Sequence, residues 1–164
     1  MFDRPVVDSS AFAREAGQLK GQVAIQDLDR LRDQVIEQAG RLDFELSGFV
    51  NARGKQALRL RVRGDLMLAC QRCLGPLAFR LDSTREFELV PPEQALDDLA
   101  EEADEIEQMH AQPKLDVLSM VEDEAILSLP MAATHDAGSC EPLATGAQGA
   151  AESPFSKLSA LKRQ

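Results

Sequence analysis

The sequence predicts a single α+β domain in which helices cover one face of an antiparallel sheet that could close into a barrel. The chain of 164 residues is long enough for one domain with a real core and too short for two well-built ones. Apolar and polar residues alternate between residues 42 and 89, which is typical of strands with one wet face, whereas the flanking segments show a helical period. We therefore expect the domain over residues 1–142, a low-complexity linker over 143–152 and a C-terminal docking helix over 153–164.

The first 40 residues predict two helices around one short strand. Asp8 or Ser9 can cap a helix over residues 11–17, and residues 19–25 read as a brief strand. Asp27 can cap a second, longer helix that ends near Gly40. Its apolar residues lie on one stripe: Leu28, Leu31, Val35 and Ile36.

Four consecutive antiparallel strands follow in the prediction. Residues 51–54 supply a turn after the first of them, and residues 70–76 supply another further along. The residues expected to face inward begin with Leu42, Phe44 and Leu46, continue through Leu58, Leu60 and Val62 to Leu66, Leu68 and Cys70, and resume with Leu77, Phe79, Leu81, Phe87 and Leu89.

An acidic segment over residues 91–112 interrupts the fold. It holds eight Asp and Glu residues and no Lys or Arg. The segment has few apolar residues to bury, so we expect a flexible insert. A helix is predicted over residues 115–129, with Asp116 as its cap and Pro130 at its end.

Composition limits the function. A net charge of −10 argues against tight, non-specific nucleic-acid binding if the charge is spread evenly, but bases outnumber acids between Arg53 and Arg85. No apolar run approaches the ~18 residues that span a bilayer, and the first residues lack the order of a secretory signal, so we expect a cytoplasmic protein that binds no membrane.

The three cysteines and one of the two histidines predict a closed structural zinc site. Cys70 and Cys73 can place two sulfurs on one ion from a tight turn, and His135 with Cys140 can complete a tetrahedron. Thiolates and a neutral imidazole are ligands that suit zinc. Two other interpretations stay open: small buried cysteines beside turns, and a thioredoxin-like redox pair.

An alternating run of arginines predicts a basic strand face. Arg59, Arg61 and Arg63 point the same way if the strand alternates, and Arg72 and Arg80 could extend the row. Such a row could contact the phosphates of RNA, or it could be a solvated face that protects a sheet edge.

Catalysis finds little support in the sequence. There is no Gly-rich phosphate loop and no nucleophile elbow. The acids Glu122, Asp123 and Glu124 are expected on the wet side of their helix. We therefore predict that the protein is not an enzyme and takes no small-molecule substrate.

Several segments resemble the YceD-like family of large ribosomal RNA subunit accumulation proteins. The matching pieces are Cys70-Gln-Arg-Cys73 followed by Pro76, the helix from Leu115 to Pro130, His135-Asp with Cys140-Glu, and the tail from Pro154 to Lys162. The resemblance implies a bacterial cytoplasmic protein needed for synthesis, processing or stability of large-subunit ribosomal RNA, with no known enzymatic activity. The zinc site is our inference from the residues.

The sequence thus favours a non-enzymatic ribosome biogenesis factor that contacts large-subunit ribosomal RNA or its precursor particles. One alternative is an adaptor that reaches the RNA through a ribosomal protein. It would use the apolar side of the tail, Phe155, Leu158 and Leu161. Another is a small zinc or redox thiol protein.

Overall fold

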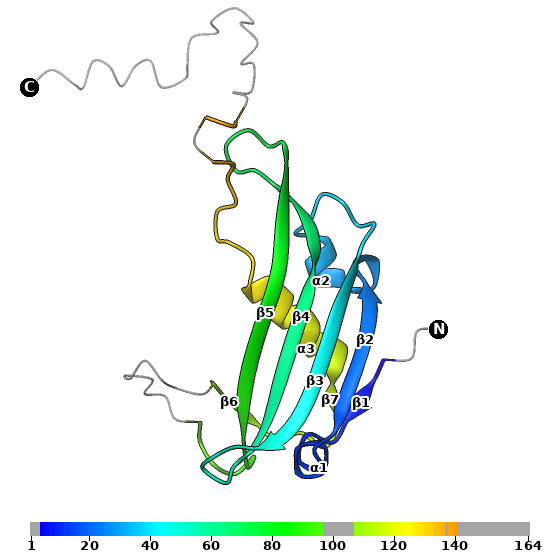
Figure 1. Cartoon of the computed structure of the whole chain (residues 1–164), viewed down its shortest axis with the longest axis vertical. Coiled ribbons are helices and arrows are strands. Elements are labelled where there is room, and N and C mark those ends of the chain that lie inside the picture. The colour runs from blue at the N-terminus through cyan, green and yellow to red at the C-terminus, as the bar shows by residue number, and fades with distance from the viewer. Residues whose placement is uncertain (1–3, 97–106, 137, 141–164) are drawn as a thin grey trace, which may run out of the picture.

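The computed structural model describes residues 4–96, 107–136 and 138–140, and its main feature is an open five-stranded sheet (Figure 1). Its strands are β2 (Gln18–Ala24), β3 (Arg41–Val50), β4 (Gln56–Ala69), β5 (Pro76–Val90) and β6 (Glu107–His110), in that spatial order. The first four are antiparallel, and β6 runs parallel to β5. The α+β prediction with an antiparallel sheet is confirmed, and the sheet does not close into a barrel.

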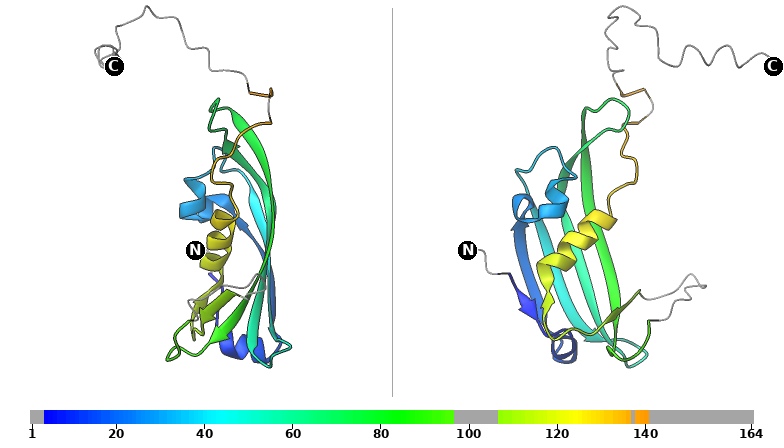
Figure 2. Two further views of the ribbon diagram at one scale, coloured as in Figure 1. Left: turned by 90° about the vertical axis from the view of Figure 1, so that its left-hand side faces the viewer. Right: turned by 180° about the vertical axis from the view of Figure 1, so that it is seen from behind.

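Helices lie on one face of this sheet, which we call the inner face (Figure 2). α3 (Val117–Leu127) crosses the strands diagonally, and α2 (Asp29–Arg32) follows a 3-10 turn, η1 (Ile25–Asp27). Two further elements lie at the other end, α1 (Ser9–Arg14) and a two-stranded sheet of β1 (Val6–Val7) and β7 (Leu115–Asp116). The opposite face, which is turned to the viewer in Figure 1 and which we call the outer face, carries none of these described helices.

The predicted alternation on β4 is confirmed. Leu58, Leu60 and Val62 are fully buried in the core beneath the helices, whereas the arginines between them are exposed. Successive side chains of a strand point to opposite faces, so one strand supplies both the core and a row of guanidinium groups outside.

Two of the predicted helix caps are present. The side chain of Asp8 accepts a hydrogen bond from Ala11 N, and the side chain of Asp116 accepts one from Ser119 N. α1 packs directly on β3, because a Cβ atom at Gly48 would lie 2.6 Å from the Cα of Ala13. Only glycine permits this close approach of two backbones.

The prediction of a long second helix was wrong. α2 has four residues instead of the span from Asp27 to Gly40, and no side chain at its own start caps it. The backbone N–H of Ile36 donates to the carbonyl of Met67. This bond holds the chain against the part of β4 that extends past the first residues of β3. Ile36 is consequently half exposed, while Leu28 and Leu31 are buried as predicted.

The prediction that the acids of α3 lie on its solvent-exposed side was wrong for two of the three. Glu122 and Glu124 are 6% and 1% exposed, whereas Asp123 is exposed as predicted. The carboxylate of Glu122 accepts hydrogen bonds from the backbone N–H groups of Arg30 and Leu31 at 2.7 and 3.2 Å. Glu122 therefore provides the cap that the start of α2 lacks.

We predicted a flexible insert over residues 91–112, but part of this segment has regular structure. Its last residues form β6, and the N–H of Ala111 then donates to the carbonyl of Val90. Met109 packs against the core, which gives this short strand an apolar contact. Residues 97–106 of the predicted insert lie outside the described part, as do the predicted linker and docking helix.

Candidate metal centre

The turn between β4 and β5 holds the first two candidate ligands, Cys70 and Cys73. The N–H of Leu74 donates to the carbonyl of Cys70 at 2.8 Å, and the N–H of Cys70 donates to the carbonyl of Gly75 at 2.9 Å. Leu74 has a φ of +57°, a left-handed conformation that reverses the chain after the second cysteine. The turn is thus tight enough to bring both sulfurs to one side.

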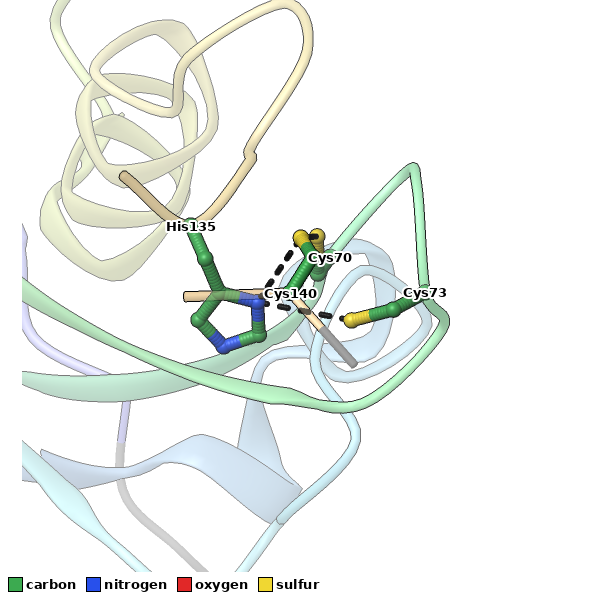
Figure 3. Close-up of side chains that lie close together, drawn as sticks. All are labelled: Cys70, Cys73, His135 and Cys140. Atoms are coloured by element: carbon green, nitrogen blue, oxygen red, sulfur yellow. Dashed lines mark hydrogen bonds between the residues drawn. The ribbon is translucent and has the colours of Figure 1, made fainter. Parts of the chain in front are cut away.

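The segment after α3 brings the other two ligands to the same turn. The N–H of Gln71 donates to the carbonyl of Ala133 at 2.8 Å, and the guanidinium of Arg72 donates to the carbonyl of His135. These contacts join residues more than sixty positions apart in the sequence. They place His135 and Cys140 against the hairpin (Figure 3).

The four side chains converge as the zinc prediction requires. Their ligand atoms all lie within 4.8 Å of one another. The sulfurs of Cys70 and Cys140 are 3.5 Å apart, and the Nδ1 atom of His135 lies 3.4 Å from the sulfur of Cys73 and 3.5 Å from that of Cys140 (Figure 3). A zinc tetrahedron with three sulfurs and one nitrogen has edges of about 3.5–3.8 Å, so this donor set fits the ion.

The imidazole of His135 is already oriented for a metal. Its Nε2 atom lies 2.9 Å from the carbonyl oxygen of Pro76, to which an Nε2–H group donates. The proton on Nε2 leaves Nδ1 as the free lone pair, and Nδ1 is the nitrogen that faces the sulfurs. A histidine held by a backbone carbonyl in this way is typical of metal ligands.

Local hydrogen bonds favour a thiolate at Cys70. Burial raises the pKa of this thiol, but the backbone N–H groups of Cys73, His135 and Arg72 and the thiol of Cys140 lower it to about 5. For Cys140, burial and the neighbouring sulfurs of Cys70 and Cys73 raise the pKa. These shifts favour a thiolate at Cys70 over one at Cys140, and a cation would be needed to stabilise further thiolates beside it.

The arrangement differs from a thioredoxin-like redox site. There the cysteine pair begins a helix that follows a strand, whereas here it lies in the turn of a hairpin, and the chain continues into the strand β5 at Pro76. The burial of Cys70, taken by itself, would also agree with the alternative that the cysteines are small buried residues beside turns. Convergence of four ligand atoms favours a metal centre over this alternative.

The predicted basic row lies on the outer face, remote from α3. Arg59, Arg61 and Arg63 of β4 and Arg80 of β5 are exposed there, and Arg72 lies in the metal-centre turn. Acids from the neighbouring strands interleave with the row: Asp43 and Glu45 on β3, and Asp82 and Glu86 on β5. The tail residues Phe155, Leu158 and Leu161 lie outside the described residues.

The sequence did not reveal a buried carboxylate network under α3. Glu124 accepts hydrogen bonds from the hydroxyls of Ser83 and Ser128, and the guanidinium of Arg85 lies 3.4 Å from it. It also lines an open cleft of about 630 Å³ between α3 and the β5–β6 edge. A signal was present, because Glu124 follows the buried Val121 by one helical turn.

No helix in the described ranges has the length and apolar character needed to cross a membrane. No solved structure matches the chain.

Comparison with known proteins confirms the resemblance. The family model described as large ribosomal RNA subunit accumulation protein YceD matches residues 58–162, which include all four candidate ligands. The curated protein of that name from Haemophilus influenzae is 31% identical over 121 residues, which cover 74% of this chain and 69% of that protein. The chain therefore belongs to the YceD family of large ribosomal RNA subunit accumulation proteins.

Proposed function

We propose that this protein is a cytoplasmic, non-enzymatic factor that supports the synthesis, processing or stability of large-subunit ribosomal RNA. Membership of the YceD family carries the proposal, because the family and its Haemophilus relative are named for the accumulation of this RNA. The name describes an effect on RNA abundance and no chemical reaction.

The outer face supports direct contact with RNA. It carries four exposed arginines on β4 and β5, with Arg41 of β3 beside them, and is covered by none of the described helices. Guanidinium groups bind phosphates through paired N–H donors and release counterions on binding. The precursor particle or its ribosomal RNA would then lie along β4 and β5, near the metal centre.

We propose that zinc occupies the metal centre as a structural ion. Four protein ligands leave no open position for a substrate, and the ion would neutralise the thiolates that burial otherwise disfavours. It would fasten residues 133–140 to the β4–β5 hairpin at the ligands already in place. A redox role for the same thiols is the less favoured alternative.

The second candidate function is that of an adaptor bound to a ribosomal protein. The interleaved acids of the outer face favour it, because they would repel phosphates. The tail residues Phe155, Leu158 and Leu161 would then make the contact, which would leave the arginines dispensable.

Co-sedimentation with ribosomal precursors tests the function. Tagged protein should travel with large-subunit precursor particles, and its depletion should lower the amount of large-subunit relative to small-subunit ribosomal RNA. Direct contact predicts crosslinks to RNA, whereas the adaptor predicts crosslinks to a ribosomal protein alone. Equal recovery with both subunits, or unchanged RNA ratios after depletion, would refute the proposal.

A further inference from the structure

The four outer-face arginines of β4 and β5 divide into two classes, which the alternating sequence does not distinguish. Arg59 and Arg61 are in ion pairs with carboxylates on β5: Arg59 lies 2.7 Å from Glu86, and Arg61 lies 3.1 Å from Asp82. The guanidinium of Arg59 also lies over the ring of Phe49, 4.9 Å from its centroid. We call these two residues the paired arginines.

Arg63 and Arg80 form the other class, which we call the open arginines. Neither makes an ion pair or a hydrogen bond through its side chain to any of the residues that the structure describes. Their strand neighbours are acids. Asp82 is held by Arg61, and Asp43 accepts a hydrogen bond from Gln22 at 2.7 Å. Glu45 is paired with Lys20, and Asp65 lies opposite Arg80 without an ion pair between them. Their guanidinium donors are therefore available to a ligand.

The register places the open arginines together at the metal-centre end of the sheet. Arg63 lies opposite Asp82, and Arg80 lies opposite Asp65, two residues further toward the turn. The two arginines are consequently diagonal neighbours, with Cα atoms about 7–8 Å apart. Beyond them Arg72 donates to backbone carbonyls and to no carboxylate of the described residues, so its positive charge is not offset by an ion pair.

The two classes of arginine differ in the free energy that a phosphate would gain by binding to them. A phosphate that binds a paired arginine must displace a carboxylate, which stays beside it and repels it. An exposed pair is worth only about 0–1 kcal/mol, so the residual repulsion matters as much as the lost pair. An open arginine also has a carboxylate opposite it in the register, but it can offer both donors of its fork without breaking an ion pair.

From these contacts we propose that Arg63 and Arg80 make the phosphate contacts to ribosomal RNA, and that Arg59 and Arg61 balance charge within the sheet. The proposal rests on direct RNA contact in the proposed function and deepens it. It locates the RNA at the end of the outer face beside the metal centre and excludes the half nearer the Asn51–Gly54 turn.

Two double variants with the same change in charge test this division. One is Arg63→Gln with Arg80→Gln, and the other is Arg59→Gln with Arg61→Gln. Arg72 is left unchanged because it holds the segment that carries His135. Binding of full-length protein to a transcript of large-subunit ribosomal RNA is measured over a range of salt concentrations, with circular dichroism and metal content as checks on folding.

The open-arginine variant should bind more weakly and lower the slope of log K against log salt by about 1.4–1.8, as expected for two lost phosphate contacts. The paired-arginine variant should keep the wild-type slope. An equal or larger loss in the paired-arginine variant, or no loss in the open-arginine variant, would overturn the division while leaving RNA binding established. If the wild-type protein binds no RNA, direct contact itself fails and the division fails with it.

Discussion

The imidazole of His135 is fixed by the first residue of β5, because its Nε2 atom lies 2.9 Å from the carbonyl oxygen of Pro76. With Nε2 held in this way, Nδ1 faces the sulfurs of Cys73 and Cys140. The hairpin therefore supplies two ligands directly and orients a third.

The first prediction concerns zinc content. Protein purified without chelator should carry about one zinc per chain, because three thiolates and one imidazole complete a tetrahedron. Cys73→Ser should lower both the zinc content and the thermal midpoint, since binding energy of a structural ion is folding energy. Elemental analysis and thermal unfolding measure the two effects.

Ser139→Ala is the matched control for this variant. Ser139 is exposed in the same segment as Cys140 and offers no ligand side chain. It should retain both metal and stability. Absence of metal from wild-type protein with all thiols reduced would reject the site.

The second prediction concerns the cap that α3 provides for α2. Burial raises the pKa of Glu122, but hydrogen bonds from the Arg30 side chain and from the N–H groups of Leu31 and Arg30 lower it below its ordinary value. Glu122→Gln should lower the free energy of unfolding at neutral pH by about 1–3 kcal/mol. Denaturant titration of both proteins measures the difference.

The pH dependence of that difference gives a sharper test. A carboxyl group whose pKa is depressed by folding contributes its stability above its unfolded pKa, and the contribution disappears as pH falls through the folded pKa. The gap between wild type and Glu122→Gln should therefore shrink below about pH 4.5. Asp123→Asn removes an exposed carboxylate from the same Arg30 and should have a small effect. A gap that is constant with pH would contradict the assignment.

The third prediction separates the two parts of the acidic segment. Replacing residues 97–106 by a Gly-Ser linker of equal length should leave the thermal midpoint nearly unchanged, because these residues have few apolar side chains to bury. Deletion of residues 95–110 should lower it, since the deletion removes β6 and its ladder with β5. Similar midpoints for both variants would show that β6 contributes nothing to stability.

The fourth prediction addresses the adaptor. Replacing Phe155, Leu158 and Leu161 together by Ala should abolish co-sedimentation with precursors if the tail binds a ribosomal protein, since these are the apolar residues of its predicted helix. Metal content and thermal midpoint serve as controls for the folded domain. Unchanged co-sedimentation, together with sensitivity to the open arginines, would leave direct RNA contact as the supported route.

The amino-acid sequence determined the features that depend on local pattern. The period-two alternation identified the core side of β4, and the short polar residues Asp8 and Asp116 marked the starts of α1 and α3. The residue types of Cys70, Cys73, His135 and Cys140 sufficed to predict one shared site, because few other roles use three cysteines and a histidine in such short groups.

Only the tertiary structure decided what depends on distant partners. Glu122 and Glu124 look like solvent-facing acids in their own helix, and they are buried because Arg30, Leu31, Ser83 and Ser128 supply hydrogen bonds from other elements or the next turn. The arginines of β4 are equivalent in a pattern of period two, and the register alone does not separate them, because Asp82 lies opposite Arg63 and yet pairs with Arg61. The local pattern of the sequence determines which face of the sheet a side chain takes, and the contacts between side chains of neighbouring strands decide which charges on that face form ion pairs.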